Sequence, residues 1–173
     1  MADKLKIAEI KHPEYALKAD EWRKWMLAYE SGSEFVSAYL ERFSKRETKP
    51  DFETRKKLTY NPPHAMAVVN SIRDAMAVKM SEVSRTGDPV YLKLISEDVD
   101  LYRQTMATFL AVEVLPLLLS QAKCYVVVDA PPMSAGMTRA DENGRPYVYA
   151  VGRERVRSWS YDGRGAFSSI LFT

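Results

Sequence analysis

The feature that most constrains this fold is a change in the spacing of apolar residues late in the chain. Upstream of residue 120, apolar residues recur every three or four positions, which is the period of amphipathic helices. From Cys124 to Val128 the apolar run is continuous and rich in valine, which is typical of a strand covered on both faces. The order of helices first and strands second predicts an α+β fold with about four to five helices followed by a small, mostly antiparallel sheet.

Prolines, glycines and capping residues set the expected limits of these elements. Helices are expected over residues 13–31, 34–43, 51–58, 62–83 and 96–120. Pro116 is expected to bend the last of them. Strands are expected over residues 124–128, 146–151, 159–161 and 166–172, and exposed connections over 44–50 and 129–145.

The length of 173 residues suits one hydrophobic core, so we expect a helical arm over residues 1–50 and an α+β domain over residues 51–173. The apolar segment Ile170–Phe172 carries no strand terminator, and an uncovered apolar strand invites aggregation. We therefore expect the domain to be incomplete at its C-terminus. The alternative is a last strand that lies inside the sheet.

Composition argues against several classes of protein. Lys and Arg total 25 against 23 Asp and Glu, so the chain as a whole lacks the charge of a dedicated nucleic-acid binder. One cysteine and two histidines form no metal-binding spacing, and the glycine-rich phosphate-binding motifs are missing. The sequence predicts no catalytic residue, no metal ligand and no cofactor. It also predicts no secretion signal and no membrane helix, because its most apolar run, residues 109–119, is too short.

Three features could be mistaken for chemistry. Asp98 with Asp100, and Asp141 with Glu142, could act as paired carboxylates. The first pair is better explained by the opening turn of a helix, and the second by a polar loop. Cys124 opens an apolar strand with no histidine beside it, so we interpret it as an inert core residue.

Two sets of residues are candidates for binding. The first set is basic and is interleaved with aromatic residues, a pattern that suits phosphate contacts as well as a solvated, salt-bridged face. Its members are Lys45, Arg46, Lys49, Arg55, Lys56 and Lys57. The second set combines tryptophan, tyrosine and arginine, which are enriched at subunit interfaces, although core packing and plain surface remain alternatives. Its members are Trp22, Trp25, Tyr29, Arg153, Arg155, Arg157 and Trp159.

The order of short motifs along the chain resembles the N-terminal part of portal proteins, the head-to-tail connectors of tailed bacteriophages. The resemblance covers most of the chain, and each motif is short and degenerate. The matching segments are His12-Pro13-Glu14-Tyr15 with the following Trp22/Tyr29 helix, Phe52–Asn61, Cys124–Pro132, Gly144–Val148 and Val156–Trp159.

This resemblance implies a structural subunit of a twelve-membered ring at one vertex of the capsid, through which DNA enters during packaging and leaves during infection. The chain would form part of the peripheral, wing-like domain. The implied partners are other copies of the chain, the major capsid protein, scaffold and head-tail adaptor proteins, and non-specific double-stranded DNA. Terminase would bind through regions that this chain lacks. The implied location is the virion, after assembly in the host cytoplasm.

Two other classes of function remain open. The first is a small intracellular adaptor domain without catalysis, whose Trp22/Tyr29 helix would dock a partner. The second is a hydrolase or nuclease with dispersed carboxylates, which no local motif supports.

Overall fold

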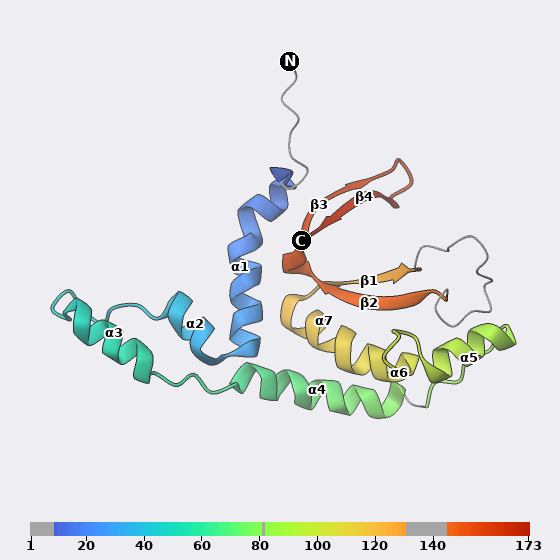
Figure 1. Cartoon of the computed structure of the whole chain (residues 1–173), viewed down its shortest axis with the longest axis horizontal. Coiled ribbons are helices and arrows are strands. Elements are labelled where there is room, and N and C mark those ends of the chain that lie inside the picture. Colours follow the sequence, from blue (N-terminus) through green and yellow to red (C-terminus); the bar gives the residue numbers. More distant parts are fainter. Residues whose placement is uncertain (1–8, 81, 131–144) are drawn as a thin grey trace, which may run out of the picture. The chain divides into compact units, whose positions relative to one another are not determined.

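The computed structural model describes residues 9–80, 82–130 and 145–173, and it shows an α+β chain in which helices precede strands (Figure 1). The chain divides into two compact units, Met1–Asn70 with Val156–Thr173, and Ser71–Arg155. The domain boundary expected at residue 50 lies inside the first unit, and that domain assignment stays a prediction.

The first unit contains α1 (Pro13–Glu30), α2 (Gly32–Tyr39), α3 (Lys49–Leu58), the beginning of α4 (His64–Met80), β3 (Val156–Tyr161) and β4 (Phe167–Phe172). Helix α1 begins where expected, because the His12 imidazole Nδ1 accepts a hydrogen bond from the Glu14 backbone N–H and Pro13 fits the first turn. The helix stops before Ser31, whose φ of 61° is left-handed.

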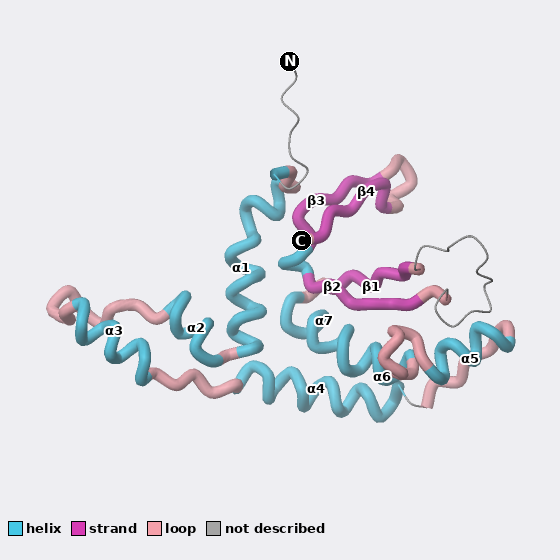
Figure 2. Tube along the Cα trace, in the orientation of Figure 1, coloured by secondary structure: helices cyan, strands magenta, loops and turns pink. Residues whose placement is uncertain are grey.

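Strands β3 and β4 form an antiparallel hairpin, as predicted (Figure 2). Its turn is organised by Asp162, whose carboxylate accepts hydrogen bonds from the backbone N–H groups of Arg164 and Ala166 at 2.8 and 2.9 Å. Gly165 adopts φ of 82°, which favours glycine. The C-terminal strand is therefore paired along one edge with β3.

The second unit contains α5 (Pro89–Glu97), α6 (Met106–Phe109), a π-helical turn (Leu110–Val114), α7 (Leu115–Gln121), β1 (Cys124–Asp129), β2 (Tyr147–Gly152) and a 3-10 turn (Arg153–Arg155). Strands β1 and β2 pair antiparallel, with Cys124 opposite Gly152 and Asp129 opposite Tyr147. The prediction that β1 is covered on both faces is wrong, because Val126 is 48% exposed and Val128 is 69% exposed.

The single helix expected over residues 96–120 is also wrong. The Asp98 and Asp100 side chains accept hydrogen bonds from the backbone N–H groups of residues 102–104, which replace helical bonds with a local loop. Leu101 and Arg103 in that loop adopt left-handed φ values of 69° and 63°. Helix then resumes at Met106, and the π-helical turn lies next to Pro116, where a helix bend was expected.

Several predicted limits need smaller corrections. The second helix ends at Tyr39 instead of residue 43, and β3 begins at Val156 instead of residue 159. Helix α3 begins at Lys49, earlier than predicted, with Thr48 as its N-cap and Pro50 in its first turn. Helix α5 is not predicted at its observed start; it begins at Pro89, with Asp88 as its N-cap. Conversely, α4 begins at His64, after the two prolines expected in its first turn.

The core of the second unit is formed by Ile95, Val99 and Phe109, which are 7%, 2% and 1% exposed. Val148 and Ala150 of β2 pack against it, together with Leu92, Met106, Leu110 and Val114. This cluster joins α5, the following loop, α6 and one face of β2. Over the described ranges, no helix is both long enough and apolar enough to cross a bilayer.

Replacement of Phe109 by Ala should lower the free energy of unfolding by about 3–5 kcal/mol, because a large buried side chain leaves a cavity. The matched control is Val90→Ala in the same unit, where the side chain is 78% exposed and the expected loss is within about 0.5 kcal/mol. Urea unfolding followed by circular dichroism measures both. Equal losses in the two variants would contradict the placement of Phe109 in the core.

Candidate nucleic-acid interface

The basic segment, residues 42–57, is the strongest concentration of positive charge in the chain. It contains seven Lys or Arg and three Asp or Glu, a net charge of +4, whereas the whole chain carries only +2. It consists of the connection after α2 and most of α3. Its structure decides how many of these charges remain available to a ligand.

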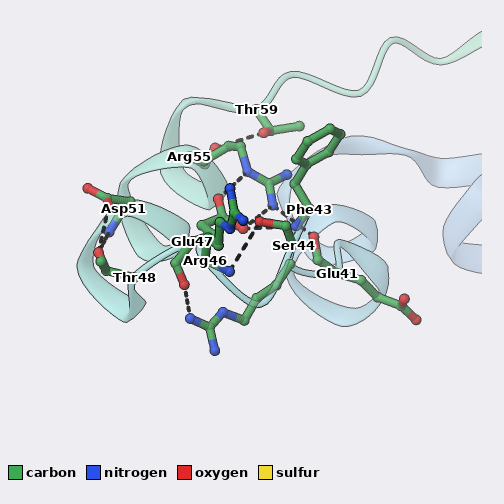
Figure 3. Close-up of polar contacts among 10 residues, drawn as sticks. Glu41, Phe43, Ser44, Arg46, Glu47, Thr48, Asp51, Arg55 and Thr59 are labelled. Carbon is green, nitrogen blue, oxygen red and sulfur yellow. Dashed lines mark hydrogen bonds and ion pairs between the residues drawn. The ribbon is translucent and has the colours of Figure 1, made fainter.

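Glu47 organises the connection (Figure 3). Its two carboxylate oxygens accept hydrogen bonds from Arg55 Nε at 2.8 Å and from Arg55 Nη2 at 2.9 Å, which is a bidentate ion pair. The same carboxylate accepts the Phe43 backbone N–H at 2.9 Å, and Arg55 also donates to the Glu41 carbonyl at 2.8 Å. The Arg42 guanidinium donates to the Glu47 carbonyl. Two arginines are therefore used to hold the loop closed.

This geometry shifts the acid–base behaviour of the pair. The hydrogen bonds from Arg55 lower the pKa of Glu47 from 4.5 to about 2, helped by the Phe43 N–H and by the charges of Arg55 and Arg42. The carboxylate in turn raises the pKa of Arg55. The Glu47 side chain is only 13% exposed, and the hydrogen bonds from Arg55 and the Phe43 N–H hold its carboxylate in place.

Helix α3 presents the remaining charges from a defined frame. The Thr48 hydroxyl accepts the Asp51 backbone N–H at 3.3 Å and donates to the Asp51 carboxylate at 2.5 Å, so both residues fix the start of the helix. The basic residues of its last turn are Arg55, Lys56 and Lys57, where the helix dipole favours cations. Lys56 Nζ lies 6.0 Å from the centre of the Phe52 ring.

Four of the predicted basic residues are exposed: Lys45, Arg46, Lys49 and Lys57. None of them forms an ion pair with any residue in the described part of the chain. Arg55 differs, because its guanidinium is engaged by Glu47. The segment thus combines a salt-bridged centre with free cations around it, an arrangement that can contact phosphates without sequence selectivity.

The sequence does not indicate the role of Glu47 or that of Arg42. A signal was present for part of this frame, because Thr48 followed three residues later by Asp51 is a helix-start pattern. The Glu47–Arg55 pair has no comparable signal, since their separation of eight residues spans a loop and two turns of helix.

The aromatic interface candidates lie mostly inside the fold. Trp22 has no exposed surface, and Trp159 is 8% exposed. Trp159 stacks on the His12 imidazole with ring centres 3.9 Å apart, and the His12 backbone N–H donates to the Arg157 carbonyl at 2.8 Å. Trp25 and Tyr29 are half-buried. The interface prediction therefore depends on the latter two and on the arginines.

The arginine candidates lie in two neighbouring elements. Arg153 and Arg155 lie in the 3-10 turn, and Arg157 lies in β3. The Arg155 side chain is 69% exposed and lies 3.7 Å from the Glu154 carboxylate, whereas Arg153 and Arg157 are half-buried. Only Arg155 is fully on the surface.

The remaining candidates for chemistry have structural surroundings. Asp98 pairs with Arg145. Burial acts to raise the pKa of the Asp98 carboxyl, but hydrogen bonds from the Arg145 side chain and the Arg103 backbone N–H outweigh burial. The pKa of Asp98 is therefore lowered. Burial raises the pKa of the half-buried Cys124 thiol, which disfavours the nucleophilic thiolate. Asp141 and Glu142 lie outside the described residues. Within the described ranges, no group of three or more His, Cys, Asp or Glu is arranged to hold a metal ion.

Comparison with models of known protein families and with curated proteins gives no match.

The Glu47 carboxyl should titrate far below an ordinary glutamate, at a pKa of about 2. Since the folded pKa is below the unfolded one, the stability that the Glu47–Arg55 pair contributes is complete above about pH 4.5 and is lost as pH falls toward 2. NMR titration of the side-chain carboxyl carbons measures this directly.

Arg55→Gln should return the Glu47 midpoint toward 4.5, the value of an unperturbed glutamate. The matched control is Lys57→Gln, at an exposed residue of the same helix, which should leave the Glu47 midpoint at about 2. A Glu47 midpoint that ignores the Arg55 substitution would show that the ion pair does not form in solution.

Proposed function

We propose that this chain is a non-enzymatic structural subunit of a phage portal ring, which forms part of the passage for DNA packaging and ejection and of the head-tail connection. The proposal joins the motif resemblance to the charge pattern of the first unit. The proposed partners are further copies of the chain, capsid, scaffold and head-tail adaptor proteins, and double-stranded DNA. The proposed location is the virion, after assembly in the host cytoplasm.

The observation that carries the proposal is the exposed part of the basic segment. Lys45, Arg46, Lys49 and Lys57 form no ion pair within the described residues and extend from a frame fixed by Glu47 and Thr48. Such a surface attracts a polyanion through counterion release and carries no groove-reading element. This is the type of contact that a wall around sliding DNA requires.

Assembly into a larger body is supported by apolar surface. Helix α4 has no buried residue, and its exposed apolar side chains recur at helical spacing. In the second unit they are Ile72 and Met76, exposed by 45% and 44%. Exposed apolar side chains on one helix face are a feature of protein interfaces.

The adaptor alternative was based on a docking helix around Trp22 and Tyr29. With Trp22 fully buried and Tyr29 half-buried, that helix offers a smaller aromatic surface than its sequence suggests. No specific contact in the described residues favours the adaptor over the ring subunit.

Binding of the 173-residue chain to double-stranded DNA should be weak and non-specific, and should decrease steeply with salt. Substitution of Lys45, Arg46 and Lys49 by Gln should reduce the slope of log K against log salt by about 0.9 for each phosphate that the variant no longer neutralises. Fluorescence anisotropy with two unrelated duplexes measures the effect.

The matched control substitutes Gln for Lys18, Lys79 and Lys93, which form ion pairs on other helices. Equal slopes in both triple variants, or sequence-selective binding, would contradict the DNA role.

The ring proposal predicts self-association of the purified chain. Electron microscopy and light scattering should detect closed rings with a central channel. The combined substitutions Arg153→Glu, Arg155→Glu and Arg157→Glu should reduce assembly while circular dichroism remains unchanged. The charge-matched control combines Lys18→Glu, Lys24→Glu and Lys93→Glu on other helices. A chain that remains monomeric at every concentration would contradict the ring proposal and favour the adaptor.

A further inference from the structure

The second unit contains a cavity of about 360 Å³. Neither the resemblance to portal proteins nor the basic segment assigns a role to this cavity. It lies beside β2 and is lined by the loop after α5, by α6 and by the π-helical turn. Among the described residues, its lining contains three carboxylates and three tyrosines, and no Lys, Arg or His. These residues are Asp100, Glu113, Asp129, Tyr102, Tyr147 and Tyr149.

Asp100 is built into the wall. It is 7% exposed, and one carboxylate oxygen accepts the backbone N–H groups of Tyr102 and Gln104 at 2.9 and 3.3 Å. The loop that carries it is anchored at Val99, whose N–H donates to the Gln104 carbonyl and whose carbonyl accepts the Val148 N–H. A charge held in this way cannot turn away from the cavity at low cost.

The negative charges of the cavity are not neutralised within the described part of the chain. Asp100, Glu113 and Asp129 form no ion pair there. Three like charges around one partly enclosed space repel one another and concentrate a negative potential inside it. A bound cation would relieve this repulsion.

The tyrosines favour an organic cation. Tyr147 and Tyr149 are on one face of β2, with ring centres 6.2 Å apart and a tilt of 31°. The Tyr147 hydroxyl donates to the Asp129 carboxylate at 3.2 Å, and burial together with that carboxylate raises the pKa of Tyr147, so the phenol keeps its proton. Neutral aromatic rings beside carboxylates suit a cation that can stack as well as donate hydrogen bonds.

Gln104 also belongs to the lining, and its side-chain oxygen accepts no hydrogen bond from any described residue. That oxygen is shielded from solvent, so a ligand N–H group reaches it only after the Gln104 side chain rotates. The described carboxylates do not gather into a metal-ion site.

We propose that this cavity binds an alkylguanidinium or alkylammonium cation, with the guanidinium favoured because its planar fork pairs with carboxylates and stacks on aromatic rings. The cation is either a free small molecule or an arginine side chain of a second copy of this chain. This site does not depend on the proposed role in a portal ring.

Calorimetric titration with n-butylguanidinium and n-butylurea tests the charge requirement, because the urea has nearly the same shape and no charge. We expect saturable binding of the guanidinium, shifts of the Tyr147 and Tyr149 ring signals in NMR spectra, and at least tenfold weaker binding of the urea. Glu113→Gln should weaken guanidinium binding about three- to fivefold, the scale for one partly exposed charge. Glu97→Gln, on α5 and outside the lining, should leave it unchanged.

Absence of saturable binding, equal binding of the urea, or equal effects of Glu113→Gln and Glu97→Gln would each overturn the proposal. Sedimentation velocity separates the two sources of the cation. Self-association that n-butylguanidinium reverses, and that Glu113→Gln also weakens, identifies an arginine of a second copy. Binding to a chain that remains monomeric identifies a free cation.

Discussion

The second unit depends on the backbone of Val99, which ties a loop to a strand. Its N–H donates to the Gln104 carbonyl at 2.9 Å, and its carbonyl accepts the Val148 N–H at 2.8 Å, while its side chain is 2% exposed in the core. These bonds satisfy a buried backbone that an interrupted helix would otherwise leave without partners. The same anchor fixes Asp100 in the cavity wall, so packing and the candidate cation site share one cause.

In the first unit, side-chain contacts hold the connection between α2 and α3. The bidentate contact of Arg55 with Glu47 holds the connection after α2, and Thr48 holds the start of α3. The ion pair uses two opposite charges for local structure, and the neighbouring Lys45, Lys49 and Lys57 form no ion pair with a described residue. The two proposed sites are opposite in sign: an exposed cationic surface suited to a polyanion, and an anionic cavity suited to a small cation.

Sequence reasoning was most successful where structure depends on neighbours along the chain. The start of α1 at Pro13, strand β2 and the β3–β4 hairpin follow from local capping, β-propensity and turn chemistry. It was least successful at Asp98 and Asp100. Acidic residues after Ser96 are equally compatible with a helix start and with a loop whose side chains bind the backbone, and only distant partners such as Arg145 and Val148 select the loop.

The sequence by itself determined the α+β order, the concentration of basic charge over residues 42–57 and the absence of the familiar phosphate-binding motifs. Tertiary structure decided which of those charges are neutralised, that Trp22 and Trp159 are buried, and that three carboxylates line one cavity. The physical reason is that local propensity depends on adjacent residues, whereas burial, ion pairing and cavities depend on residues that the chain brings together only when it folds.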